Sequence, residues 1–144
     1  MAKEILPKEN IIIGTKLNNK EEAIRYTGKI LVDNGYVDAS YVDKMVEREH
    51  VATTYIGNHV AIPHGTEDAK EAVKETGLSV VITKEGVDFN GNTVNILIGI
   101  AGKGNEHLDI LSKIAIVCSE EANIKTLIEA SSEQEIIDLF SGVN

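Results

Sequence analysis

The sequence predicts an α+β fold in which helices cover both faces of a small mixed sheet. Short runs rich in Ile and Val, typical of buried strands, are interspersed with segments whose apolar residues recur at helical spacing. Helical segments lie both before and after the strand segments, which favours helices on both faces. The last three strand segments follow one another closely, which permits antiparallel neighbours. The predicted order is therefore β-α-α-β-β-β-α-α-α.

The N-terminal half of the chain is predicted to form a strand, two helices and a second strand. Asn19 is a typical helix cap, and Gly35 follows a helical pattern, as expected of a residue that ends a helix. The predicted segments are a strand over 11–13, a helix between 19 and 35, a helix from about 38 to 49, a loop over 53–58 and a strand ending at His64.

The C-terminal half contains strong strand signals followed by helical ones. β-Branched residues predict strands over 78–83 and 93–100, and Asn90-Gly91-Asn92 predicts a turn between them. A short helix is expected over 67–74. Three helices are expected after residue 105, the last opening with a capping-box pattern at Ser132. In the first of these, the helical stripe Leu108, Leu111, Ala115 and Cys118 is expected to face the core.

Composition and charge exclude several classes of function. The chain has 144 residues, which suits one domain over 1–144, and a formal net charge of -9. Such a charge argues against nucleic acid or an anionic membrane as a partner and is compatible with a basic protein partner. The single Cys118 cannot form an internal disulfide and is expected to be a buried, inert thiol. Without a membrane span or signal peptide, a cytoplasmic protein is expected.

The segment Val60-Ala61-Ile62-Pro63-His64-Gly65-Thr66 is the most informative part of the chain. Pro63 lacks an amide hydrogen and ends an apolar run, and Gly65 permits unusual backbone angles. His64 is therefore expected at the end of a strand, where a rigid scaffold presents it. An imidazole in this setting can be a nucleophile that carries a covalent group. The competing interpretation is a turn histidine that bonds to a backbone carbonyl.

Two other segments can serve a phosphorylated imidazole. Arg48, at the end of the second helix, has a planar guanidinium that can bond to two phosphoryl oxygens. His107 lies where a loop enters a helix, near Asn105, and can donate to a phosphoryl group. Of the remaining histidines, His50 is expected to be solvated at the helix end. His59 lies five residues before His64, on the opposite face of an extended strand, so the two are not expected to form a metal pair.

These segments together resemble the mannitol-specific IIA component of the phosphotransferase system, within a family that also includes fructose and nitrogen-related IIA domains. The resemblance covers the whole chain in order. It rests on the following segments: 26–37, Glu47-Arg48-Glu49, 62–67 with Ala69-Lys70, Glu85-Gly86-Val87 and Asn105-Glu106-His107.

The resemblance implies a three-layer α/β/α domain and a phosphohistidine carrier cycle. His64 would accept a phosphoryl group from the phosphocarrier protein HPr and pass it to a cysteine of the IIB domain of the mannitol IICB transporter. Arg48 and His107 would contact the phosphoryl group. No cofactor and no metal are implied, because phosphoryl transfer needs mainly positioning and charge stabilisation.

Two alternatives belong to other classes of function. A nitrogen-related or fructose-type IIA domain would regulate partner proteins or serve another sugar. A metal-dependent hydrolase would use His59, His64 and His107, although these residues lack a recognised metal-ligand spacing.

Overall fold

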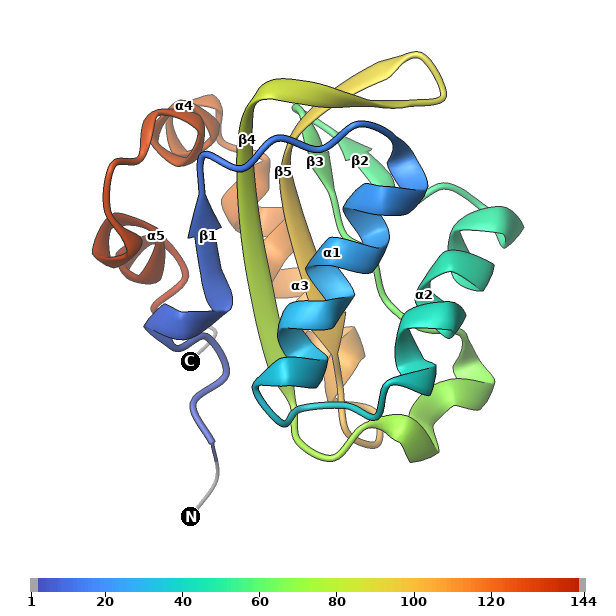
Figure 1. Ribbon diagram of the computed structural model, residues 1–144. Helices are drawn as coiled ribbons and strands as arrows, with labels where there is room; N and C mark the ends of the chain where they lie inside the picture. Colours follow the sequence, from blue (N-terminus) through green and yellow to red (C-terminus); the bar gives the residue numbers. More distant parts are fainter. Residues whose placement is uncertain (1–2, 143–144) are drawn as a thin grey trace.

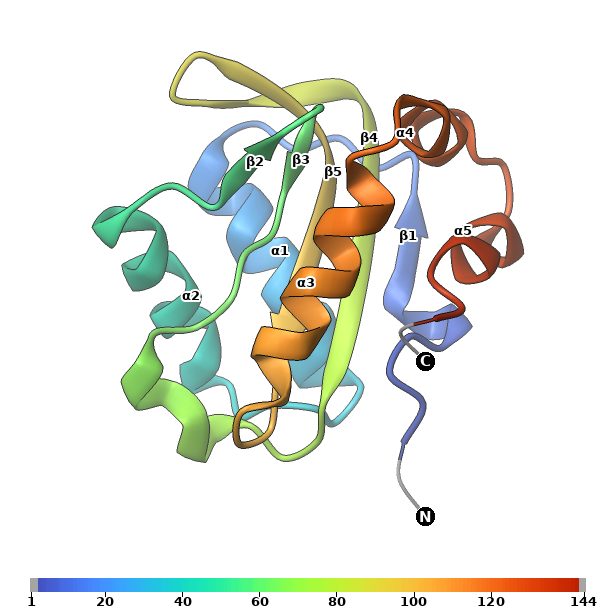
Figure 2. The same ribbon diagram turned by 180° about the vertical axis from the view of Figure 1, so that it is seen from behind.

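A computed structural model describes residues 3–142, which form a five-stranded mixed sheet between two layers of helices (Figures 1 and 2). The strand order is β1-β4-β5-β3-β2, with β1 parallel to β4, β4 antiparallel to β5, β5 parallel to β3 and β3 antiparallel to β2. The strands are β1 (Ile11–Ile13), β2 (Tyr55–Gly57), β3 (Val60–Ala61), β4 (Gly77–Phe89) and β5 (Asn92–Ala101). The α-helices are α1 (Lys20–Asp33), α2 (Ser40–Val51), α3 (Glu106–Cys118), α4 (Glu121–Glu129) and α5 (Glu133–Leu139). Two short 3-10 helices are η1 (Lys8–Asn10) and η2 (Glu67–Ala72).

The sheet is buried on both faces, which explains the continuous apolar runs in β4 and β5. Successive residues of β5 point to opposite faces: Ile96, Ile98 and Ile100 pack on the side of α3, α4 and α5, whereas Leu97 and Ala101 pack on the side of α1 and α2. The three-layer arrangement expected from the resemblance is thereby confirmed. None of the helices within residues 3–142 is long and apolar enough to cross a membrane.

Local signals placed most elements correctly. The predicted turn between β4 and β5 has positive φ at Asn90 (55°) and Gly91 (94°), the geometry that favours Asn-Gly in tight hairpins. The predicted capping box at the start of α5 is present between Ser132 and Glu135. Cys118 is buried, as expected, and burial raises the pKa of its thiol to about 11.

Several details of the predicted fold are wrong. β4 continues to Phe89, beyond the strand predicted over 78–83. The expected loop over 53–58 contains β2, an edge strand of three residues that pairs with β3 across a tight connection with positive φ at Asn58 and His59. In α3, Leu108 is 59% exposed and Ala115 is exposed, while Ile110, Ile114 and Cys118 form the buried face. This helix is apolar on two sides, so its pattern alone does not decide which side meets the sheet.

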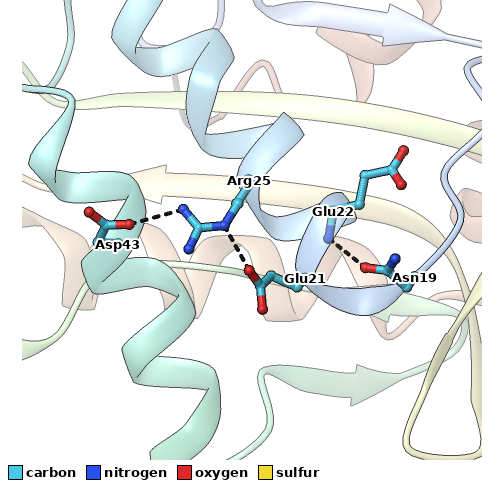
Figure 3. Close-up of polar contacts among 5 residues, drawn as sticks. All are labelled: Asn19, Glu21, Glu22, Arg25 and Asp43. Carbon is cyan, nitrogen blue, oxygen red and sulfur yellow. Dashed lines mark hydrogen bonds and ion pairs between the residues drawn. The ribbon is translucent and has the colours of Figure 1, made fainter.

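Helix α2, which carries Arg48, is fixed against α1. A Cβ added at Gly28 of α1 would lie 2.7 Å from the Sδ atom of Met45, so glycine permits this close approach. Figure 3 shows a polar link at the surface of the same interface: Arg25 donates to Glu21 at 3.0 Å and to Asp43 of α2 at 2.9 Å. The Asn19 side chain caps α1 by accepting from the backbone N–H of Glu22. Exposed ion pairs contribute about 0.2–1 kcal/mol each, so packing is the stronger of the two restraints.

Candidate phosphoryl-transfer site

His64 is held at the end of the sheet by the parallel pairing of β3 with β5. The pairs Val60–Ile96 and Ala61–Leu97 set the register. β3 ends at Ala61, earlier than the sequence predicted, because the backbone then reaches Pro63, which cannot donate a hydrogen bond. The Pro63 carbonyl nevertheless accepts from the N–H of Ile100 at 2.9 Å, and His64 forms an isolated parallel bridge with Ile100. His64 is therefore anchored to β5 although it lies outside a regular strand.

The His64 ring bonds to the backbone through one of its two nitrogens. Its Nδ1 atom lies 2.8 Å from the carbonyl oxygen of Ile62. A carbonyl oxygen only accepts, so Nδ1 carries the proton and donates it, and Nε2 has the free lone pair. The bond expected of an ordinary turn histidine is thus present. It also leaves Nε2 as the nucleophilic atom.

Tyr41 braces the segment that follows His64. Its hydroxyl group donates to the Ile100 carbonyl at 2.8 Å and accepts from the N–H of Gly65 at 2.9 Å. Tyr41 is only 5% exposed, and a Cβ added at Gly65 would clash with its ring. A single buried hydroxyl group therefore joins α2, the end of β5 and the histidine segment.

The fold brings His107 to the same place. His64 and His107 line one small pocket, together with Thr66 and Lys70. A Cβ added at Gly102 would clash with the backbone of His107, so glycine permits the tight passage from β5 into α3. The two sides of the pocket are also joined by polar contacts: Lys70 donates to the Asn105 side chain at 3.1 Å, and Glu67 Oε1 lies 3.7 Å from His107 Nε2. Figure 2 shows η2 and the start of α3 at the same end of the molecule.

Arg48 approaches His64 from the C-terminal end of α2. Its Nη1 atom donates to the Ala52 carbonyl at 2.7 Å, and the side chain is half-buried. This bond holds the guanidinium beside the helix end and leaves its other N–H donors available. The charge of Arg48 acts directly on the ionisation of His64. His64 and His107 thus line one pocket, whereas Arg48 is not among the residues that line it but is near enough for its charge to act on His64.

The environment of His64 favours its neutral form. Burial is the largest cause and lowers the pKa of His64 below its ordinary value of 6.5. The bond to the Ile62 carbonyl raises the pKa in part, Arg48 and His107 lower it, and Glu49 raises it slightly. A neutral imidazole is the nucleophilic form, so this environment suits an acceptor of a phosphoryl group.

The other histidines lie elsewhere. His50 is exposed, as expected. His59 borders a different hollow, lined by residues of α4, and lies in the turn between β2 and β3. The set His59, His64 and His107 considered for a hydrolase is therefore not assembled. Within residues 3–142, no three His, Cys, Asp or Glu side chains are grouped as metal ligands.

Sequence reasoning assigned no role to two buried polar residues of the site, Tyr41 and Glu49. Both lie on the buried face of α2, at positions i and i+8, with Met45 between them at i+4. Glu49 is only 4% exposed. A carboxylate on an apolar helix stripe is a signal that could have drawn attention to Glu49, since buried carboxylates are rare and need partners.

The chain is similar to known proteins over its whole length. The family model described as "Phosphoenolpyruvate-dependent sugar phosphotransferase system, EIIA 2" matches residues 4–143. The mannitol-specific phosphotransferase enzyme IIA component of Geobacillus stearothermophilus is 59% identical, and the alignment covers 100% of both chains.

Two solved structures extend the comparison. A complex of enzyme IIAMTL and phosphorylated enzyme IIBMTL from Escherichia coli contains a chain with a TM-score of 0.88 and 37% identity, covering 94% of this chain and 96% of that one. The nitrogen regulatory protein IIA-Ntr from Neisseria meningitidis has a TM-score of 0.82 at 26% identity, covering 94% and 96%. The chain belongs to the EIIA 2 family of the phosphoenolpyruvate-dependent sugar phosphotransferase system.

Proposed function

We propose that this chain carries a phosphoryl group on Nε2 of His64 between the phosphocarrier protein HPr and a cysteine of a mannitol IIB domain. The observation that carries the proposal is the bond from His64 Nδ1 to the Ile62 carbonyl, which leaves the Nε2 lone pair free. Residues 1–144 act as one carrier domain in this proposal. Because the donor system uses phosphoenolpyruvate, the transfer takes place in the cytoplasm.

The first step forms a P–N bond at His64. The Nε2 lone pair attacks the phosphorus of phospho-HPr as the bond from phosphorus to HPr breaks, and HPr keeps that electron pair. In the second step the thiolate of the IIB cysteine attacks the same phosphorus, and the P–N electron pair returns to Nε2. Nδ1 keeps its proton throughout, because the Ile62 carbonyl holds it.

Arg48 and His107 supply stabilisation during both steps. A transferring phosphoryl group spreads negative charge over three oxygens, and fixed donors aimed at those oxygens lower the barrier. The N–H groups that Arg48 does not use on Ala52 can bond to two of them. His107, which lies in the first turn of α3 and lines the same pocket as His64, adds another donor. A few such contacts stabilise the phosphoryl group and still release it to the next carrier.

Mannitol is the sugar that the relatives support best. The relative that is 59% identical over the whole chain is named mannitol-specific, whereas the nitrogen regulatory protein is 26% identical. The complex of enzyme IIAMTL with phosphorylated enzyme IIBMTL supports a IIB protein as the phosphoryl acceptor.

A reconstitution experiment tests this function. Purified chain is added with phosphoenolpyruvate to an extract that contains enzyme I, HPr and the mannitol transporter but lacks its own IIA component. We expect mannitol phosphorylation to be restored, and fructose phosphorylation in a matched extract to stay at its background rate. A chain that accepts phosphoryl from HPr but restores no mannitol phosphorylation would support a regulatory role instead.

A further inference from the structure

Glu49 is a buried carboxylate that the proposed transfer chemistry does not use. It follows Arg48 directly in α2, and its side chain turns into the protein, where the residue is 4% exposed. Its Oε1 atom accepts two hydrogen bonds from Thr54: from the backbone N–H at 3.0 Å and from the hydroxyl group at 2.5 Å. Thr54 is also buried, at 3% exposed. Burying a carboxylate costs free energy unless it is hydrogen-bonded, so the contacts of a buried one indicate what it does.

The hydrogen bonds of Thr54 continue toward the active histidine. The Thr54 carbonyl accepts from the N–H of Ile62 at 3.0 Å. The Ile62 carbonyl in turn accepts from Nδ1 of His64 at 2.8 Å. A connected series therefore runs from Glu49 through Thr54 and Ile62 to the imidazole, and it crosses from the end of α2 to the segment after β3. We call it the Glu49 relay.

We propose that Glu49 is a positioning residue for phosphoryl transfer, which holds His64 in the Nδ1–H tautomer through Thr54 and Ile62. This inference rests on the proposed function of His64. The carboxylate fixes Thr54 at two atoms, Thr54 fixes the backbone of Ile62, and the Ile62 carbonyl fixes the ring and its proton. Arg48 and Glu49 are neighbours in one helix, so α2 aligns both the phosphoryl-binding guanidinium and the nucleophile.

Alternative roles for Glu49 predict different behaviour. If only its charge mattered, Glu49→Gln and Glu49→Ala would be equally harmful, since both remove the charge. The other charged or titratable groups around His64 are Tyr41 and Arg48 of α2, His107 of α3, and Glu67 and Lys70 of η2. If it acts by position, an amide that keeps an oxygen in the same place preserves much of the effect. Glu49→Gln and Glu49→Ala therefore separate the two cases.

The experiment compares Glu49→Ala, Glu49→Gln and Thr54→Val with the wild type. Glu47→Ala is the matched control, since Glu47 lies two residues earlier on the same helix and is exposed. Two quantities are measured on each folded protein: the ¹⁵N chemical shifts of the His64 ring, which report the tautomer, and the rate of phosphoryl acceptance from phospho-HPr.

We expect Glu49→Ala to shift the ring toward a mixture with the Nε2–H form and to slow acceptance about 10- to 100-fold, as small misplacements of reacting groups do. Glu49→Gln should retain most of the Nδ1–H form and most of the acceptance rate. Thr54→Val should show the same changes as Glu49→Ala to a smaller degree. Glu47→Ala should resemble the wild type. If Glu49→Ala does not fold, Thr54→Val carries the test.

Either of two results would overturn the positioning role. The first is an unchanged ring tautomer in Glu49→Ala or, if that variant does not fold, in Thr54→Val. The second is an equal loss of the phosphoryl acceptance rate in Glu49→Gln and Glu49→Ala. The ring spectra need no phosphoryl transfer. A wild-type chain that accepts no phosphoryl group would therefore refute the proposed function, while the tautomer still decides the role of Glu49.

Discussion

His64 donates from Nδ1 to the carbonyl oxygen of Ile62, two residues earlier in the chain, across 2.8 Å. This short-range bond decides which ring nitrogen can react. It depends on long-range structure, because Ile62 is fixed by Thr54 and the next residue, Pro63, by Ile100 of β5. The sheet and α2 together therefore hold the His64 ring and leave its Nε2 atom free, as the proposed carrier role requires.

Arg48→Ala should slow phosphoryl acceptance by about 100-fold or more, the usual effect of removing a donor from developing charge. Arg48→Lys should recover part of the rate, because an ammonium group keeps the charge but lacks the planar fork. Stopped-flow transfer from phospho-HPr measures both. A transfer rate for Arg48→Ala equal to that of the wild type would show that Arg48 takes no part in phosphoryl acceptance.

The ionisation of His64 should occur below pH 6.5, because burial, Arg48 and His107 together outweigh the bond to Ile62 and the charge of Glu49. The neutral, nucleophilic form then persists into mildly acidic solution. The same shift affects stability: as pH falls below the unfolded-state pKa, the unfolded chain binds more protons, so the free energy of unfolding decreases until the folded-state pKa is passed.

Proton NMR of the His64 ring during a pH titration measures the midpoint directly. Denaturant unfolding between pH 7 and 5 measures the linked loss of stability, and His64→Gln should make that loss smaller. A titration midpoint for the His64 ring at or above pH 6.5 would contradict the expected lowering of its pKa by burial, Arg48 and His107.

Tyr41→Phe should destabilise the fold by about 1–3 kcal/mol, because it leaves the Gly65 N–H and the Ile100 carbonyl without their buried partner. It should also slow phosphoryl transfer, since Gly65 adjoins the nucleophile. Tyr36→Phe is the matched control: Tyr36 is buried and donates to the Glu4 carbonyl at 2.6 Å, away from the pocket residues. Equal transfer rates in the two variants would limit Tyr41 to a structural role.

Partner encounter should depend on salt, because a net charge of -9 attracts a basic docking face over a range that salt shortens to about 8 Å at physiological ionic strength. We expect the final contact to depend on exposed apolar residues. Val60 is fully buried, whereas Ile56 of β2 is 42% exposed and Leu108, adjacent to His107 in the chain, is 59% exposed.

Leu108→Ser should therefore weaken association at every salt concentration and leave the slope of rate against salt unchanged. Stopped-flow transfer rates over a salt series, for both proteins, test this. A wild-type rate that does not vary with salt would show that the acidic charge serves solubility alone.

Much of the fold followed from local patterns in the sequence. The Asn90-Gly91 turn, the Ser132 capping box and the helix ends near Asn19 and Gly35 are specified by residues within a few positions of one another. β2 escaped prediction because a three-residue edge strand is defined by its partner β3. The buried face of α3 was predicted wrongly because the helix is apolar on two sides, and only its packing against the sheet determines which side is buried.

The site could be predicted only in part, for the same reason. Individual residue properties and the family resemblance pointed to His64, Arg48 and His107. Tyr41 acts on Gly65 and Ile100 across sequence separations of 24 and 59 residues, and such contacts leave no local pattern. The Glu49 relay likewise depends on the backbone of Ile62 lying beside Thr54, which only the pairing of β3 with β2 and β5 provides.

The central claim is that Nε2 of His64 carries the phosphoryl group. The most direct measurement incubates the chain with enzyme I, HPr and phosphoenolpyruvate, followed by mass spectrometry at alkaline pH and by ³¹P and ¹⁵N NMR of the product. We expect a single phosphoryl group, bonded to Nε2 of His64, and none on a folded His64→Ala variant. Undiminished labelling of that variant, or a phosphoryl group on Nδ1, would contradict the claim.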